Sequence, residues 1–191
     1  MHEVKERITN LLRFTEREGI EDLIQWMNEN GFFDAPCSSK YHLSKPGGLA
    51  EHSLNVFRTA FSLLESFYLK PGNKFTYDFI DSIIICTLLH DIGKAGQYGK
   101  PNYCTGAEMH SGEGFAGHFT YETNKDLLYV PHEIRSIAII SKFIQLTEEE
   151  QFAIIYHNGL YSELKSIKGN ETPLYMILHF ADLWAARVIE E

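Results

Sequence analysis

Residues 83–94 read IIICTLLHDIGK, an apolar run that ends in a histidine, an aspartate and a glycine. The helix expected over residues 76–90 is apolar almost all round, which is typical of the central helix of a bundle. Adjacent side chains on a helix point about 100° apart. His90 and Asp91 can therefore reach one metal ion only where the helix ends, and we expect Gly93 to provide that end. The alternative is a solvated helix end that carries a histidine and an aspartate.

Two further segments offer partners for this pair. A helix expected over residues 48–68 has His52 in its first turn, and Asp182 lies in the last helical segment, after Pro173. Two histidines and two aspartates would hold one ion and leave positions open for water and substrate, as catalytic sites require.

With these ligands in this order on three helices, the chain resembles the HD superfamily of metal-dependent phosphohydrolases over most of its length. It is most similar to the HD domain of bacterial 3′-5′ exoribonucleases and their stand-alone relatives. The resemblance rests on blocks at residues 35–42 (APCSSKYH), 47–53 (GGLAEHS), 88–94 (LLHDIGK), 156–159 (YHNG) and 172–182 (TPL through HFAD). The chain departs from these relatives in reading YHNG where they often have His-His-Gly. No separate nucleic-acid-binding domain precedes the blocks, which argues against a polynucleotide substrate.

The resemblance also implies a second ion. In binuclear HD proteins two further histidines lie between the His-Asp pair and the last aspartate, and the aspartate of the pair bridges the ions. His132 and His157 match them, at similar separations: 157 − 132 = 25 and 182 − 157 = 25. His118, in a glycine-rich loop, is the alternative to His132, and a surface histidine at a helix end is the alternative for either match. Nitrogen and carboxylate ligands suit one or two divalent ions of Mn, Fe, Co, Ni or Zn.

The resemblance assigns roles to further residues. Two ions about 3.5–4 Å apart would activate a bridging water and clamp a phosphoryl group, with Asp91 and Lys94 as the catalytic residues. Lys94, where relatives place a lysine near the substrate phosphate, is one candidate for holding phosphate oxygens, and Arg187, chosen only because it lies five residues past Asp182, is the other. Lys40 and His42 match the block ahead of the first ligand helix and are expected to border the substrate pocket. Solvated surface side chains are the alternative for the lysines and the arginine.

Length and charge limit the classes of function. A chain of 191 residues fits one domain, and 17 basic against 26 acidic residues give a formal charge of −9. This charge disfavours long nucleic acid as a partner, and a small phosphorylated substrate is expected instead. Three widely spaced cysteines are expected to be free thiols. With no signal core and no membrane-length apolar segment, we expect a cytoplasmic protein. The pattern does not specify an oligomeric state.

The predicted fold is all-α, a single HD-type helical bundle that spans residues 1–191. N-terminal helices are expected within residues 1–31, and the metal-binding core over residues 48–191. A glycine-rich loop and a small β-hairpin form an insertion at about residues 93–130, with expected strands at 119–122 and 127–130.

Capping residues mark the later helices. Pro131 starts a helix through about Phe143, and Thr147 with Glu150 forms a capping box for the next helix. Thr172-Pro173 starts the last helix in the same manner.

The expected function is hydrolysis of a phosphoester in a nucleotide or short oligonucleotide, as a monoesterase or a phosphodiesterase. Two alternatives use the same residues. One is an HD-type mixed-valence di-iron oxygenase that cleaves a carbon–phosphorus or carbon–carbon bond. The other is a non-catalytic nucleotide-binding module, against which the paired His90 and Asp91 argue.

Overall fold

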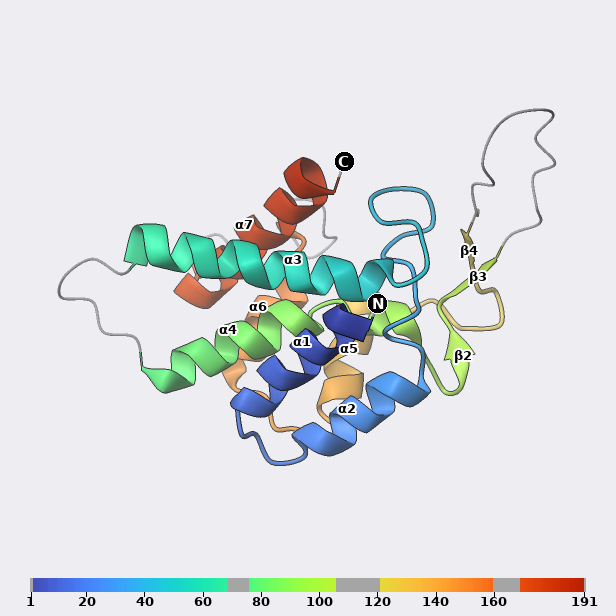
Figure 1. The fold of residues 1–191 in the computed structure, drawn as a ribbon, viewed down its shortest axis with the longest axis horizontal. Helices are drawn as coiled ribbons and strands as arrows, with labels where there is room; N and C mark the ends of the chain where they lie inside the picture. Colours follow the sequence, from blue (N-terminus) through green and yellow to red (C-terminus); the bar gives the residue numbers. More distant parts are fainter. Residues whose placement is uncertain (1, 69–75, 106–120, 160–168, 191) are drawn as a thin grey trace.

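The computed structural model describes residues 2–68, 76–105, 121–159 and 169–190, and these contain seven α-helices (Figure 1). The predicted all-α class with small β elements is confirmed. The helices are α1 (His2–Phe14), α2 (Ile20–Glu29), α3 (Gly48–Leu63), α4 (Tyr77–Leu89), α5 (His132–Ile140), α6 (Glu148–Tyr156) and α7 (Pro173–Trp184). Short π-helices continue two of them, at Leu64–Tyr68 after α3 and at Ala185–Ile189 after α7.

Helix α4 is the centre of the bundle, as its sequence predicts. All of its residues from Ser82 to Leu89 are buried. It packs against α1, α3, α6 and α7, and α3 runs alongside it in Figure 1. Full burial of one Ile or Leu side chain stabilises a fold by about 1.5–3 kcal/mol, so this helix anchors the core and holds its C-terminal residues rigidly.

Threonine caps fix where three of the helices begin. The hydroxyls of Thr76, Thr147 and Thr172 each accept a hydrogen bond from a backbone N–H in the first turn of the following helix. At Thr147 the predicted capping box is complete, since Glu150 also accepts from the Thr147 N–H at 2.8 Å. Local sequence therefore sets where these three helices begin, and the candidate ligands lie at or near their opposite ends.

Glu150 also ties separate parts of the bundle together. Its buried carboxylate pairs with the Arg17 guanidinium, from the turn before α2. It also accepts a hydrogen bond of 2.7 Å from the Ser82 hydroxyl of α4.

Helix α4 ends close to the predicted position, but Gly93 does not end it in the way that we predicted. The helix ends at Leu89, His90 keeps helical dihedral angles, and Asp91 leaves them at φ −104° and ψ 7° before a 3₁₀ turn over Ile92–Ala95. Gly93 does not adopt the left-handed conformation of a glycine cap. A Cβ at Gly93 would lie 2.3 Å from the carbonyl oxygen of His132, so glycine is required because α5 approaches closely.

The predicted hairpin of residues 119–122 with 127–130 is wrong. Strand β4 (Tyr121–Thr123) pairs antiparallel with β3 (Tyr103–Thr105), and a second small ladder joins β1 (Gly96–Gln97) to β2 (Lys100–Pro101). Residues 127–130 form no strand, because after a turn the chain runs directly into α5. Residues 119 and 120, and the glycine-rich stretch from 106, lie outside the described residues.

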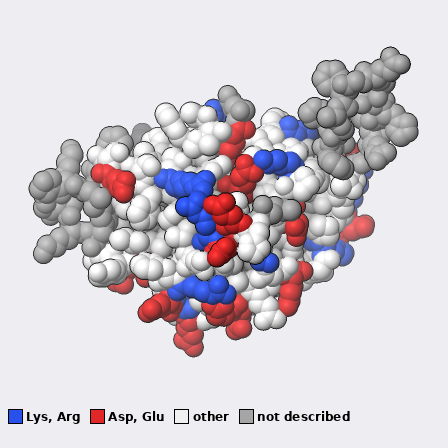
Figure 2. Space-filling view, viewed as in Figure 1, with Lys and Arg blue, Asp and Glu red and all other residues white. Residues whose placement is uncertain are grey.

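Acidic and basic side chains are interspersed on the face shown in Figure 2, without a block of one sign. Within the described parts of the chain, no helix has the length and apolar character needed to cross a membrane.

Candidate metal centre

The six predicted metal ligands lie together at one place in the bundle. His52 comes from α3, His90 and Asp91 follow α4, His132 begins α5, His157 caps α6, and Asp182 comes from α7. The side chains of His52, His90, Asp91 and His157 are at most 1% exposed, whereas His132 and Asp182 are 27% and 18% exposed. The cluster therefore has a buried floor and a partly open rim.

Asp91 lies between two pairs of histidines. Its Oδ2 atom is 3.6 Å from His52 Nε2 and 3.4 Å from His90 Nε2. Its Oδ1 atom is 3.1 Å from His132 Nε2 and 3.6 Å from His157 Nε2. Each carboxylate oxygen thus faces its own pair of ring nitrogens.

Asp182 completes the group around Asp91 Oδ2. Its Oδ1 atom lies 3.1 Å from His52 Nε2 and 3.8 Å from His90 Nε2. Ligand atoms on one ion with bonds of about 2.0–2.2 Å lie about 3–3.6 Å apart. The spacing in this cluster is close to that range.

Three buried polar atoms in the cluster have no hydrogen-bond partner: His52 Nε2, His90 Nε2 and Asp91 Oδ1. Neighbouring carboxylates are near these ring nitrogens but are not aligned as acceptors. An unsatisfied buried polar group costs about 1–3 kcal/mol. A bound cation would satisfy all three atoms, so these residues fit a metal site.

The other ring nitrogens are held by backbone carbonyls. His90 Nδ1 donates to the Thr87 carbonyl at 3.0 Å, and His157 Nδ1 donates to the Ile154 carbonyl at 2.7 Å. In both rings the proton is therefore assigned to Nδ1, which leaves a lone pair on Nε2, inside the cluster. Because each carbonyl lies three residues earlier on the same chain segment, the helix end itself sets the ring orientation.

Glu190 holds the remaining nitrogen of His52. Its carboxylate lies 2.9 Å from His52 Nδ1, and it accepts a further hydrogen bond of 3.0 Å from Asn55 Nδ2. Neither residue was predicted from the sequence. Asn55 lies three residues after His52 on α3, and this helical spacing could have predicted that the two side chains are neighbours. Glu190 is 138 residues away from His52, and no local pattern could have predicted their contact.

Two more side chains support the histidines on the other side of the cluster. Asn158 contacts both the His132 ring, with its Nδ2 3.2 Å from Nε2, and the Glu133 carboxylate. His179 Nδ1 donates to the His157 carbonyl at 2.7 Å. His179 thus fixes the backbone of a candidate ligand instead of facing an ion.

The predicted substrate-binding residues are distributed unevenly. Lys94 is near the cluster, with Nζ 2.6 Å from Asp91 Oδ2 and a side chain 16% exposed. The His42 side chain is 22% exposed, and its ring lies 5.1 Å from that of His52. Lys40 is exposed. Arg187 lines a groove between α3 and α7 instead of the cluster.

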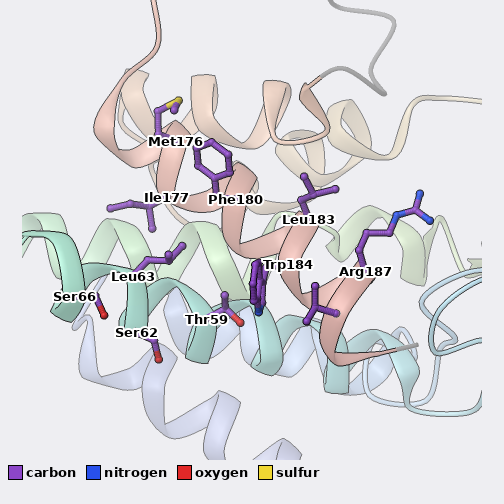
Figure 3. A pocket seen from close by; sticks show the side chains of 11 residues that line it. Thr59, Ser62, Leu63, Ser66, Met176, Ile177, Phe180, Leu183, Trp184 and Arg187 are labelled. Carbon is purple, nitrogen blue, oxygen red and sulfur yellow. The ribbon is translucent and has the colours of Figure 1, made fainter.

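This groove has a volume of about 920 Å³ and is almost wholly apolar (Figure 3). Phe180 and Trp184 of α7 face Leu63 of α3 across it, and Arg187 lies toward one end. None of the six predicted ligands lines it.

Electrostatics favour negative charge within the cluster. Burial opposes ionisation of Asp91, yet Lys94, His90 and His132 hold its pKa well below the usual range. Burial also opposes protonation of His52, but the Cys37 sulfur and the Asp182 and Glu190 carboxylates raise its pKa. Ionised carboxylates that raise a buried histidine pKa create a field that attracts cations.

Comparison of the chain with protein-family models, with curated proteins and with solved structures gave no significant match. The buried histidine and aspartate groups that could hold metal ions are therefore the main guide to function.

Proposed function

We propose that this chain is a metal-dependent phosphohydrolase of the HD type that acts on a nucleotide or a short oligonucleotide. The observation that carries the proposal is Asp91, whose two oxygens face two different pairs of histidines. A carboxylate placed in this manner suits a bridge between two ions. The resemblance of the ligand order to the HD superfamily supports the same conclusion.

The residues divide into two groups around this bridge. His52, His90 and Asp182 lie with Asp91 Oδ2 and would hold one ion. His132 and His157 lie with Asp91 Oδ1 and would hold the other. When bound, such a pair of ions activates a water molecule and neutralises charge on a phosphoryl group.

Lys94 lies at the partly open rim of the cluster, where it could contact a bound substrate. Burial lowers the pKa of Lys94, but Asp91 and its other neighbours raise it by more, so the ammonium stays charged. A charged ammonium at the rim, 2.6 Å from the bridging carboxylate, can donate to a phosphate oxygen placed over the cluster. The partly exposed His132 ring would border the same substrate.

A small substrate agrees with the charge of the molecule. The formal charge is −9, and the face in Figure 2 has no basic block to follow a polynucleotide backbone. Long nucleic acid would be repelled, while a mono- or dinucleotide needs only the few cationic groups at the rim. We assign the whole function to one domain of 191 residues.

The test combines metal content with a hydrolysis screen. Protein purified without added metal is subjected to elemental analysis as wild type, as His157→Ala and as His2→Ala. His2 is the matched control, because its side chain is 96% exposed and lies outside the cluster. We expect His157→Ala to hold one ion per chain fewer than the wild type and His2→Ala, because only the cluster variant loses a ligand of the binuclear centre.

The screen covers nucleoside monophosphates, cyclic nucleotides, dinucleotides and a generic phosphodiester. Turnover that is lost on chelation and restored by Mn²⁺ or Co²⁺ supports the proposal. Absence of metal-dependent hydrolysis on all four classes would overturn it. Two irons with substrate-dependent oxygen consumption would replace the hydrolase with the di-iron oxygenase.

A further inference from the structure

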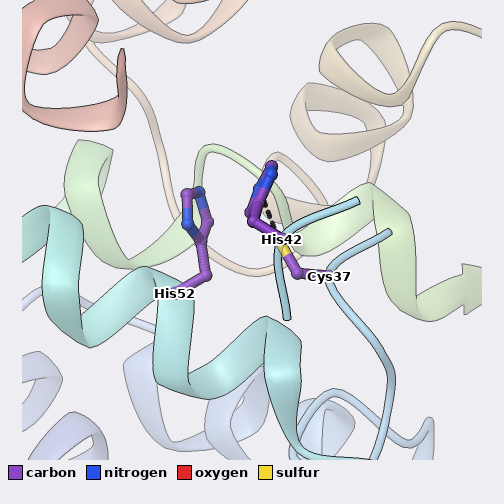
Figure 4. Close-up of side chains that lie close together, drawn as sticks. All are labelled: Cys37, His42 and His52. Carbon is purple, nitrogen blue, oxygen red and sulfur yellow. Dashed lines mark hydrogen bonds between the residues drawn. The ribbon is translucent and has the colours of Figure 1, made fainter. Parts of the chain in front are cut away.

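A second group of potential ligands lies beside His52. It consists of Cys37 and His42, from the segment before α3 (Figure 4), and Glu190, which follows the π-helix after α7. Cys37 Sγ lies 3.4 Å from His42 Nε2, and His42 Nε2 lies 4.0 Å from Glu190 Oε2. One potential ligand atom each of Cys37, His42 and His52 lies within 4.8 Å of the other two.

These distances suit a small coordination site. With bonds of about 2.0–2.3 Å to nitrogen, oxygen and sulfur, the ligand atoms of a tetrahedral site lie about 3.3–3.7 Å apart. The Cys37–His42 distance of 3.4 Å lies in this range, and the His42–Glu190 distance of 4.0 Å lies slightly above it. A sulfur, an imidazole and a carboxylate together favour a borderline-soft ion such as Zn²⁺.

The loop that carries Cys37 and His42 holds them together before any ligand binds. The Cys37 N–H donates to the Leu43 carbonyl at 3.1 Å, and the Ser38 hydroxyl donates to the His42 carbonyl at 3.0 Å. Cys37 and Glu190 are buried, while the His42 side chain is 22% exposed and gives a route to solvent. The site is thus preorganised, with one accessible edge.

We propose that Cys37, His42 and Glu190 form a separate, thiolate-containing site for one Zn²⁺-like ion next to the binuclear centre. His52 is the boundary between the two sites. Its Nε2 faces Asp182, and its Nδ1 faces the Glu190 carboxylate. An ion at Glu190 therefore competes with His52 Nδ1 for that carboxylate, so filling this site alters the orientation of a candidate ligand of the binuclear centre.

Co²⁺ is the probe, because a cobalt–thiolate bond gives a near-ultraviolet charge-transfer band that nitrogen and carboxylate ligands do not give. Metal-free full-length protein is titrated with Co²⁺ and followed by absorption and by elemental analysis. We expect a band that saturates at one thiolate-bound ion per chain, with release of the Cys37 proton. Cys37→Ser should lose the band and one equivalent of bound metal.

Cys104→Ser is the matched control, since Cys104 is an exposed free cysteine on β3, and this variant should keep the band. His42→Gln should weaken the Co²⁺ affinity that the band reports by at least about tenfold. His157→Ala should keep the band while losing an ion from the binuclear centre. Circular dichroism of each variant establishes that it is folded.

Two outcomes would overturn the proposal. One is a folded wild-type protein that binds Co²⁺ without the charge-transfer band, a result that leaves the hydrolase proposal untouched. The other is a band that is lost in His157→Ala and unchanged in His42→Gln, because Cys37 would then be a ligand of the binuclear centre itself. The test does not depend on any hydrolytic activity.

Discussion

Asp91 is the residue that both groups of histidines share. Because each of its oxygens faces one pair, Asp91→Ala removes a ligand from each proposed ion at once. We expect this variant to bind little metal and to lose more than about 100-fold in hydrolytic rate. Elemental analysis and the nucleotide screen measure both effects. Asp126→Ala, an exposed aspartate, should behave as wild type; an Asp91→Ala protein with two ions would contradict the bridging role.

Glu190 affects the centre through His52 instead of touching an ion there. Glu190→Gln keeps an oxygen that can accept a hydrogen bond from His52 Nδ1. It removes the negative charge that makes the His52 ring a stronger ligand for a metal ion. We expect metal affinity at the binuclear centre to fall about tenfold, measured by competition with a chromophoric chelator. The exposed Glu122→Gln is the control. An unchanged affinity would contradict a role for Glu190 in orienting His52.

The resemblance of the ligand order selected the six candidate ligands from the sequence, and residues without such a signal could not be selected. The positions of His52, His90, His132 and His157 near helix ends follow from local punctuation, which a single sequence displays. No local sequence pattern identifies Glu190, because its nearness to His52 depends on how α7 packs against α3. Arg187 was selected by its distance in sequence from Asp182, and it lies instead in the apolar groove.

At the scale of elements, the contact between Gly93 and α5 sets the position of His132. A Cβ at Gly93 would lie 2.3 Å from the His132 carbonyl oxygen and 2.9 Å from the Ser136 nitrogen, both backbone atoms. We expect Gly93→Ala to destabilise the protein by about 1–3 kcal/mol, measured by urea unfolding, and to displace α5. Its metal content should fall as in His132→Ala, but when both variants are kept metal-free by a chelator only Gly93→Ala should show this loss of stability. Equal stability of the two variants would contradict the close approach.

The pair of Arg17 and Glu150 joins three elements through one buried carboxylate. Arg17→Ala would leave that carboxylate with the Ser82 hydroxyl and the Thr147 N–H but without a cation. Removal of one partner of a buried pair costs about 3–5 kcal/mol, and since the Arg17 side chain is 21% exposed we expect about 2–3 kcal/mol in urea unfolding. Arg13→Ala, which breaks an exposed pair with Glu21, should have little effect. Similar losses in both variants would contradict a special role for Glu150.

Helices were predictable because their signals are local, and the small strands were not. The capping box at Thr147 and Glu150 lies within four residues, so sequence alone places the start of α6. Strand β4 pairs with β3, which precedes it by a long segment, and nothing near Tyr121 identifies that partner. The apolar residues Leu128 and Tyr129 gave a pattern that is typical of a second strand, yet their side chains are exposed, at 85% and 83%.

At the scale of the whole molecule, the centre joins five helices, and its occupancy should control global stability. A ligand that binds only the folded state stabilises it by about 2.7 kcal/mol at 100 times its dissociation constant. For a protein of this size that corresponds to about 5–11 °C in Tm. We expect chelation to lower Tm by this order in differential scanning fluorimetry, and readdition of metal to restore it. His157→Ala should show a smaller drop, and an unchanged wild-type Tm would contradict a structural contribution of the ions.

The span of the His52–Glu190 contact also bears on biosynthesis. These residues lie 138 positions apart, and α7, which carries Asp182, is made after the four other helices that contribute candidate ligands. Contacts so distant in sequence close slowly, and a chain leaving the ribosome has only part of the centre until α7 emerges. The complete set of candidate ligands therefore forms only after α7 has been translated, and we expect metal to load after that point.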